Sequence, residues 1–390
     1  MQMNSAAEWM RKRRRLAVAN NQLILNMLEQ RKETGSSVSA AAGFDGVVDA
    51  IVRIIKKQDE QGQKYYFQTI DEFGKYLITK KNMSCSLEME LQQEKIGGNM
   101  AIFSNCLGTL GMPVECIGSM GEPEIHPLFQ DMNSNCSLHS VCKYGQCNAL
   151  EFFDGKVMLY SMDSLKELTW ENICNRLGQE QVAAYFRNSQ LVALLNWSEL
   201  FDATDLFRKI YANSMKDNPD KNKWVFLDLS DASRRTEEEI REVLKLGEEI
   251  GTSRTTIFSM NENECQLVYR ALFGEECKNR TEMGKRISRR LHIDYLVLHL
   301  PDSAYGYVGQ TEVREEGYFT STPKLSTGGG DNFNAGLCFG MLHGLPLQES
   351  LKLGNAVSGY YVRNGKSPDI RQLCTFIQEE DRKKRGEHAS

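Results

Sequence analysis

The sequence predicts an α/β protein whose largely parallel sheet is covered by helices on both faces. Short apolar runs recur after residue 185, at Leu191–Leu195, Trp224–Leu229, Thr256–Met260 and Tyr295–Leu300. Segments with helical periodicity follow these runs, as at Glu237–Glu249 and Glu264–Leu272. Strands of a parallel sheet read as nearly continuous apolar runs because helices cover both of its faces. We therefore expect a three-layer α/β/α core.

Length and charge limit the classes of function. With 390 residues, 41% of them hydrophobic, the chain can bury one large core and carry additions to it. Lys and Arg total 47 against 52 Asp and Glu, so a net charge of −5 argues against a broad nucleic-acid surface. The basic run Arg11–Arg15 is interpreted as a solvated helix face.

Cysteine spacing and hydropathy indicate the compartment. The 11 cysteines form no C-x-x-C pair, which excludes the usual zinc and thioredoxin-like patterns and favours reduced thiols. The apolar stretches are far shorter than the roughly 20 residues of a membrane helix, and no signal peptide is recognised. We expect a cytoplasmic protein that binds a small molecule, and neither membrane nor nucleic acid.

Four segments are expected along the chain. Residues 1–37 form an N-terminal helical extension, with a charged amphipathic helix at 6–33. The core is expected at 38–375, opening with an apolar strand near Ala40–Val48, and a charged tail at 376–390. Apolar residues alternate with polar ones at 57–95, which suits strands covered on one face. A lid is therefore expected at 52–95, with 140–165 as a further candidate.

The segment with the clearest chemistry runs from Ser326 to Gly336 and reads S-T-G-G-G-D-N-F-N-A-G. Its three glycines allow a sharp turn that aims consecutive N–H groups at one point, and a helix starting near Asp331 adds its positive end. A carboxylate beside such an anion hole can accept the proton of an attacking hydroxyl. The alternative is a glycine-rich turn with Asp331 as an ordinary N-cap.

This segment resembles the second motif of ribokinase-like (PfkB-type) carbohydrate kinases, T-G-A-G-D-x-F-x-A-G. The resemblance implies that Asp331 is the catalytic base and that Gly328, Gly329 and Gly330 form the anion hole. Gly329 stands where alanine is usual. The resemblance covers about residues 38–370 and implies a ribokinase-like three-layer core with a small β-rich lid, ATP and Mg²⁺ as cofactors, and a homodimer formed through the lid.

Two further segments resemble the acceptor-binding part of this family. Gly97, Gly98 and Asn99 begin a match to G-G-x-x-x-N-x-A-x-x-L-x-x-L-G, although Ile102 replaces the usual asparagine. In the segment G-F-D-G-V-V-D, Asp49 is the first candidate to bind sugar hydroxyls and Asp45 the alternative. A carboxylate can accept charge-assisted hydrogen bonds from paired hydroxyls. A plain surface turn remains open for either residue.

The nucleotide side is indicated by weaker matches. Asn261 and Glu264 match N-x-x-E, which implies that Asn261 contacts the cofactor and that Glu264 contacts the metal through water. The same residues would also suit a helix cap. Asn355 and Ser358 match the segment beside the purine, and Asp228 begins a weaker match to D-x-N-x-R. The usual T-x-G-x-x-G is absent from Val297–Asp302, so the nucleotide loop is altered.

These motifs predict an ATP-dependent carbohydrate kinase that phosphorylates a sugar hydroxymethyl group. A nucleoside kinase and a catalytically silent sugar-binding protein on the same fold are the alternatives. Asn364-Gly365-Lys366-Ser367 is not a Walker A loop, because Tyr360 stands where that motif needs glycine. The identity of the acceptor, and ATP against ADP as the donor, stay open at this point.

Overall fold

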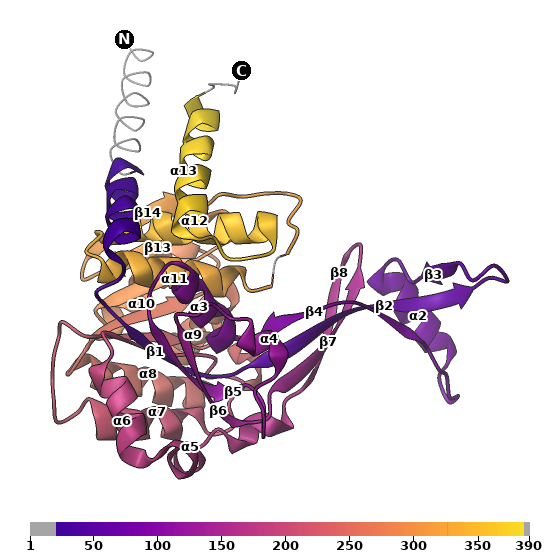
Figure 1. Ribbon diagram of the computed structural model, residues 1–390, viewed down its shortest axis with the longest axis horizontal. Coiled ribbons are helices and arrows are strands. Elements are labelled where there is room, and N and C mark those ends of the chain that lie inside the picture. Colours follow the sequence, from indigo (N-terminus) through magenta and orange to yellow (C-terminus); the bar gives the residue numbers. More distant parts are fainter. Residues whose placement is uncertain (1–20, 326, 386–390) are drawn as a thin grey trace.

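The computed structural model describes residues 21–325 and 327–385 (Figure 1). Its larger sheet has nine strands in the order β14-β13-β12-β11-β10-β9-β1-β5-β6. The strands are β1 (Ala40–Phe44), β5 (Val114–Ser119), β6 (Cys136–Cys142), β9 (Leu191–Leu194), β10 (Trp224–Asp228), β11 (Thr255–Met260), β12 (Tyr295–His299), β13 (Ser303–Val308) and β14 (Thr311–Glu316). All pairs from β6 to β12 are parallel, whereas β13 and β14 pair antiparallel at one edge. The predicted fold class is confirmed.

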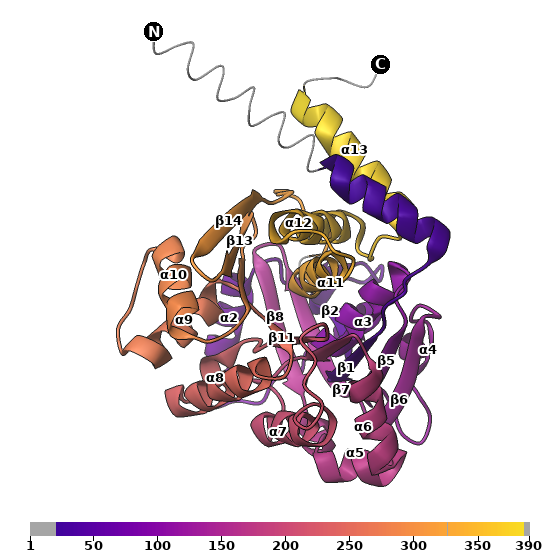
Figure 2. The ribbon, with the colours of Figure 1, turned by 90° about the vertical axis from the view of Figure 1, so that its left-hand side faces the viewer.

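Helices cover both faces of this sheet (Figure 2). One side carries the helix at 21–34, α3 (Asn99–Thr109), α11 (Gly329–Leu342), α12 (Leu347–Asn364) and α13 (Ile370–Arg385). The other carries α5 (Trp170–Leu177), α6 (Gln179–Asn188), α7 (Ala203–Ser214), α8 (Glu237–Gly251), α9 (Glu262–Phe273) and α10 (Arg280–Arg290). Along β9, Leu191 and Ala193 join the first core, while Val192 and Leu194 join the second. This alternation explains why the strand reads as a continuous apolar run.

A second, five-stranded sheet projects from the core as the lid (Figure 1). It comprises β2 (Val47–Gln58), β3 (Lys64–Tyr66), β4 (Met89–Gly97), β7 (Gly145–Phe152) and β8 (Gly155–Ser161), with α2 (Ile70–Thr79). Strand β2 is antiparallel to β4 and parallel to β7. Phe67, Phe73 and Phe152 pack together in this part. The lid sheet thus begins at Val47, before residue 52, and draws strands from both segments considered above.

The helix at 21–34 and α13 lie side by side in both ribbon views (Figures 1 and 2). Ile24 and Leu28 share a buried cluster with Leu373 and Ile377. Residues 376–385 therefore continue α13, where the sequence suggested a charged tail, because Phe376 and Ile377 are buried while the exposed residues include Glu379, Arg382 and Lys383. Residues 1–20 and 386–390, which hold the rest of the predicted extension and tail, lie outside the described residues.

Within the described ranges, no helix has both the length and the apolar character needed to cross a membrane. The cysteines are free thiols, as the spacing suggested. The fourth helix, α4 (Pro127–Gln130), and the short 3₁₀ turns at Asp163–Glu167 and Ala232–Arg234 complete the elements.

Candidate active site

Polar residues gather where adjacent parallel strands end. Asp45 follows β1, Asn196 follows β9, Asp228 ends β10, Asn261 follows β11 and His299 ends β12. Because these strands are neighbours in the sheet, their carboxyl ends form one continuous edge. Open α/β sheets bind ligands at this edge. The edge is therefore the candidate active site.

Helix α11 brings the glycine-rich segment to the same edge. Gly328 is its N-cap, with a left-handed φ of 91°, and the helix begins at Gly329, so Asp331 is its third residue rather than an N-cap. The first helical bond runs from the Asn332 N–H to the Gly328 carbonyl at 3.1 Å. The amides of residues 329 to 331 precede it and lack helical acceptors. They form an electropositive end beside the Asp331 carboxylate.

The charges of three other carboxyl groups act on Asp331. Burial, followed by the charges of Asp228, Asp45 and Glu264, holds the pKa of Asp331 well above its usual range. Burial and the charge of Asp45 raise the pKa of Asp228 to about 6. Burial and the charge of Asp228 raise the pKa of Glu264 to about 8. A raised pKa gives Asp331 a stronger affinity for a proton, which suits a general base.

Asp228 fixes α11 on the sheet. Its Oδ2 accepts a hydrogen bond from Asn334 Nδ2 at 2.8 Å, and its Oδ1 accepts one from the Ser230 N–H at 2.7 Å. Asn334 Oδ1 in turn accepts a bond from Ser259 Oγ on β11 at 2.7 Å. Asn334 lies three residues after Asp331, so this buried network orients the helical turn that carries Asp331.

Asp45 anchors the junction between the core and the lid. Its carboxylate accepts hydrogen bonds from the amides of Asn99 at 2.8 Å and Met100 at 3.0 Å, and from Asn196 Nδ2 at 2.8 Å. Gly98 is in a left-handed conformation with φ 87°, and a Cβ there would lie 2.7 Å from the Asp45 carbonyl oxygen. The first turn of α3 is thereby held against the end of β1.

The carboxylate of Asp49 accepts fewer hydrogen bonds from the protein than that of Asp45, so it can accept more from a ligand. It lies on β2, buried at 3% exposure, and its carboxylate is 3.5 Å from Lys95 Nζ on β4. A Cβ on Gly97 would come within 2.6 Å of Asp49 Oδ1, so only glycine allows this approach. Burial raises the pKa of Asp49, against the lowering effect of Lys95. These contacts favour Asp49 over Asp45 as the group that meets an acceptor.

Asn261 and Glu264 form a capping box at the start of α9. Asn261 accepts a bond from the Glu264 N–H at 3.0 Å, and Glu264 Oε2 accepts one from the Asn261 N–H at 3.0 Å. Asn261 and Glu264 therefore do cap the helix, which was the alternative to contacts with the cofactor and the metal. Over the described parts of the chain, no three His, Cys, Asp or Glu side chains form a metal-binding group. Glu264 offers a carboxylate, an oxygen ligand of the kind that Mg²⁺ prefers.

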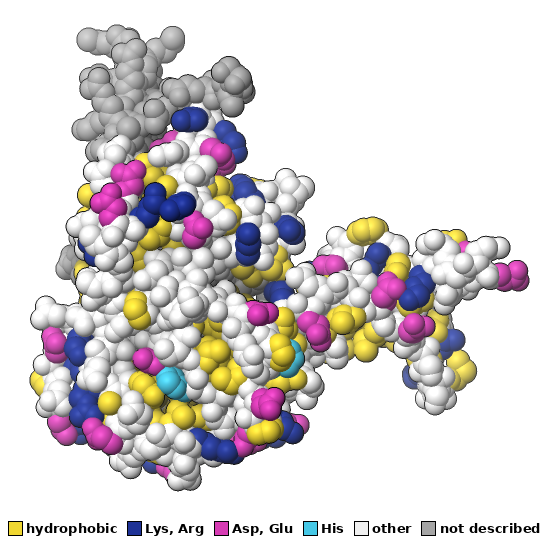
Figure 3. Space-filling model, in the orientation of Figure 1, with side chains coloured by type: hydrophobic (Ala, Val, Ile, Leu, Met, Phe, Trp, Pro, Cys, Tyr) yellow, Lys and Arg dark blue, Asp and Glu magenta, His cyan; other side chains and the backbone are white. Residues whose placement is uncertain are grey.

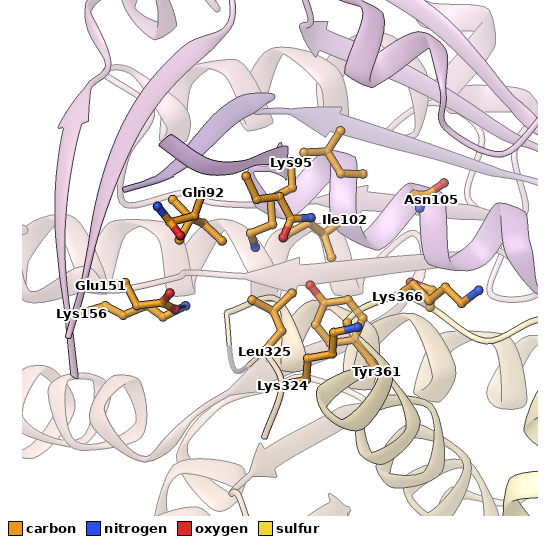
Figure 4. Close-up of a pocket in the computed structure, with 15 residues that line it drawn as sticks. Gln92, Lys95, Ile102, Asn105, Glu151, Lys156, Lys324, Leu325, Tyr361 and Lys366 are labelled. Carbon is orange, nitrogen blue, oxygen red and sulfur yellow. Dashed lines mark ion pairs between the residues drawn. The ribbon is translucent and has the colours of Figure 1, made fainter. Parts of the chain in front are cut away.

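The structure has two cavities near the start of α11. One, of about 560 Å³, is lined by residues that include Asn261, His299, Gly329, Gly330, Asn355 and Ser358. The other, of about 370 Å³, lies between the lid and the end of α12, where Figure 4 shows Lys95, Ile102 and Tyr361. A Cβ on Gly328 would lie 2.7 Å from Tyr361 Oη and 3.1 Å from Ile102 Cδ1. Gly329 and Gly330 thus line the larger cavity, and Gly328 contacts two residues that line the smaller one.

His299 lines the larger cavity from the end of β12. Its ring stacks on Phe333 with centroids 5.2 Å apart. Burial lowers the pKa of His299 to about 4, so the ring is neutral at physiological pH. The cavity accordingly presents an aromatic, uncharged wall beside the polar groups of Asn355 and Ser358.

The structure adds residues that the motifs did not single out. Asn334 and Tyr361 contact the network and the turn around Asp331, while Lys324 and Lys366 line the smaller cavity. The i+3 spacing from Asp331 could have indicated Asn334. Lys324 and Lys366 meet only through tertiary structure, and no sequence pattern joins them.

Comparisons with known proteins identify the family and the fold. A family model described as prokaryotic ketohexokinase matches residues 20–380. A ketohexokinase of Haloferax volcanii is 26% identical over 337 residues, covering 86% of this chain and 89% of that protein. Among solved structures, Arabidopsis thaliana ribokinase complexed with ribose and ATP superimposes with a TM-score of 0.63 at 15% identity, covering 88% of this chain and 99% of that chain. Adenosine kinase from Sinorhizobium meliloti gives 0.62 at 17% identity, covering 88% and 100%.

Proposed function

The chain belongs to the prokaryotic ketohexokinase family and is a sugar kinase, and from that premise we propose that it transfers the γ-phosphoryl group of MgATP to a hydroxymethyl group of a ketose. The single observation that carries this proposal is the position of Asp331 in the first turn of α11, beside free helix-terminal amides and directly after Gly329 and Gly330, which line the larger cavity. The larger cavity takes the nucleotide and the smaller one takes the acceptor.

Asp331 acts as the general base. Its carboxylate accepts the proton of the acceptor hydroxyl while that oxygen attacks the γ-phosphorus in line with the departing ADP. The elevated pKa makes the carboxylate a better proton acceptor than an exposed aspartate. Asp228 and Asn334 keep the carboxylate in position through their bond at 2.8 Å.

Residues 328 to 331 stabilise the transferring group. The amides at the start of α11 donate hydrogen bonds to the phosphoryl oxygens as these gather charge. Glu264 would contact the water shell of an Mg²⁺ ion bound to the ATP phosphates, and that ion would neutralise part of the charge. Asn261, Asn355 and Ser358 contact the nucleotide in the larger cavity.

Asp49 orients the acceptor, and Gly97, Gly98 and Asn99 form the turn against which the acceptor packs. This turn begins where β4 leaves the lid, so the lid closes over the acceptor and keeps water from the γ-phosphoryl group. Because hydrolysis of ATP would compete with transfer, exclusion of water is necessary for efficient phosphorylation.

The acceptor class is tested by ADP release from MgATP over a panel of ketoses, aldoses, their phosphates and nucleosides. We expect turnover with ketoses or their derivatives and little with nucleosides, because the curated relative is a ketohexokinase. Turnover confined to nucleosides would overturn the acceptor assignment. Ligand binding without any turnover would favour the catalytically silent alternative.

We further propose that the lid pairs with that of a second copy. Its exposed face carries large apolar side chains (Figure 3), namely Ile78, Met83, Met89, Leu91, Phe153 and Leu159. Apolar surface of this kind marks interaction sites in soluble proteins. Light scattering at micromolar concentration should give the mass of two chains, and the mass of one chain would refute the pairing.

A further inference from the structure

We propose that the smaller cavity binds an acceptor that carries an anionic group, a phosphate or a carboxylate, held by Lys324 and Lys366. This inference rests on the proposed function and narrows its substrate class from a ketose to an acidic or phosphorylated ketose. Three observations support it. The cavity is lined by several lysines, two of these lysines have no acidic partner within the part of the chain that the structure describes, and the chain segment that carries them contacts the segment that carries Asp331.

The cavity wall is strongly basic. Among its lining residues are four lysines and a single acidic residue, Glu151 (Figure 4). The lysines are Lys95, Lys156, Lys324 and Lys366. A neutral sugar gives such a wall no charge to bind, whereas an anionic group would make charge-assisted hydrogen bonds with it.

Two of these lysines already face a carboxylate. Lys95 Nζ lies 3.5 Å from Asp49 Oδ2, and Lys156 Nζ lies 3.1 Å from Glu151 Oε1. Lys324 and Lys366 have no acidic side chain within ion-pair distance among the described residues. The uncompensated positive charge of the cavity therefore belongs to these two.

The two lysines are neighbours in space. The stem of Lys324 lies against Gly365, where a Cβ would come 3.5 Å from Lys324 Cδ, and Gly365 directly precedes Lys366. The Lys324 N–H donates to the Val362 carbonyl at 2.8 Å, which fixes its backbone beside the end of α12. An anionic group in the cavity would be attracted by both ammonium groups.

The same segment is tied to the reacting centre. Ser367 Oγ donates to Asn332 Oδ1 at 2.7 Å, and Asn332 directly follows Asp331. Tyr361 Oη donates to the Thr327 carbonyl at 3.0 Å. An acceptor in this cavity can thus present its hydroxymethyl group toward Asp331 while its anionic end meets the lysines. Although it is not a Walker A loop, the segment Asn364-Gly365-Lys366-Ser367 would thus help to bind an anion through Lys366.

The test compares Lys324→Gln/Lys366→Gln with a control, Lys216→Gln/Lys245→Gln, which removes two exposed lysines outside the site. Acceptors are D-fructose, its 1- and 6-phosphates and a 2-keto sugar acid. We expect wild type to prefer an anionic acceptor, and the site variant to lose about tenfold or more in kcat/KM for it, mainly through KM. The site variant should turn over D-fructose at nearly the wild-type rate, and the control variant should behave like the wild type with every acceptor. Preference for a fructose phosphate or for the sugar acid shows whether the site binds a phosphate or a carboxylate.

Equal or better use of D-fructose by wild type, with no effect of the site variant on anionic acceptors, would overturn the inference. Failure of the proposed function is distinguishable, since then no acceptor would be phosphorylated at all. In that case calorimetric titration with the same compounds still tests whether the two lysines bind an anionic group. Binding of an anionic compound that the site variant loses supports the lysine site, and no binding of any anionic compound refutes it.

Discussion

Replacing Asp331 with asparagine should lower kcat by roughly a thousandfold, within the range lost when a general base is removed, and leave KM for both substrates nearly unchanged. Asparagine has nearly the same shape but cannot accept the hydroxyl proton. The variant should fold, because asparagine keeps the shape of the side chain and the buried network depends on Asp228 and Asn334 instead. Initial rates of ADP release at saturating MgATP and acceptor measure the effect.

The pH dependence of the wild type provides a second reading of the same residue. The base must be ionised, so kcat/KM should fall as the pH decreases through the pKa of Asp331, which burial and neighbouring carboxylates raise. The acidic limb should therefore lie above the range of an ordinary aspartate. The exposed control Asp217→Asn should keep both the rate and this limb. Near-normal turnover of Asp331→Asn would remove Asp331 as the base.

Replacing Gly328 with alanine should reduce kcat by about a hundredfold, comparable to the loss of one donor from an oxyanion hole. The left-handed φ of 91° is strained for alanine, and its Cβ would lie 2.7 Å from Tyr361 Oη. The turn would have to shift, and the N–H groups that follow it would no longer point at the same phosphoryl group.

The neighbouring change Gly329→Ala is the matched control. A Cβ there would meet only side-chain atoms, Val362 Cγ1 at 3.3 Å and Ser358 Oγ at 3.5 Å, and the residue lies inside α11. We expect activity and melting temperature close to wild type. Equal losses in both variants would show that the turn does not depend on the conformation of Gly328.

Much of the fold could be predicted because the central strands are buried on both faces. Leu191–Leu194 is apolar at every position, and such a run indicates a strand between two helical layers. The edge hairpin was not predicted, because β14 is mostly polar and lies at the sheet's margin. The charges of α13 similarly concealed the face of Leu373 and Ile377 that packs on the N-terminal helix.

The candidate site divides in the same way. Asp331 and its glycines are contiguous, so a local motif and elementary helix electrostatics could indicate them. Asp45, Asn196 and Asp228 meet only because β1, β9 and β10 are adjacent, and strand order cannot be read from one sequence. For the same reason, it took the tertiary structure to show that Lys324 and Lys366 line one cavity.

Direct detection of the phosphorylated product tests the central claim most directly. ATP labelled at the γ-phosphate is incubated with enzyme, Mg²⁺ and each acceptor, and the label is located by mass spectrometry and NMR. The account predicts one labelled ester at an acceptor hydroxymethyl group for each ADP released, and its loss in Asp331→Asn. Release of ADP with the label in inorganic phosphate, or transfer that persists without Asp331, would contradict it.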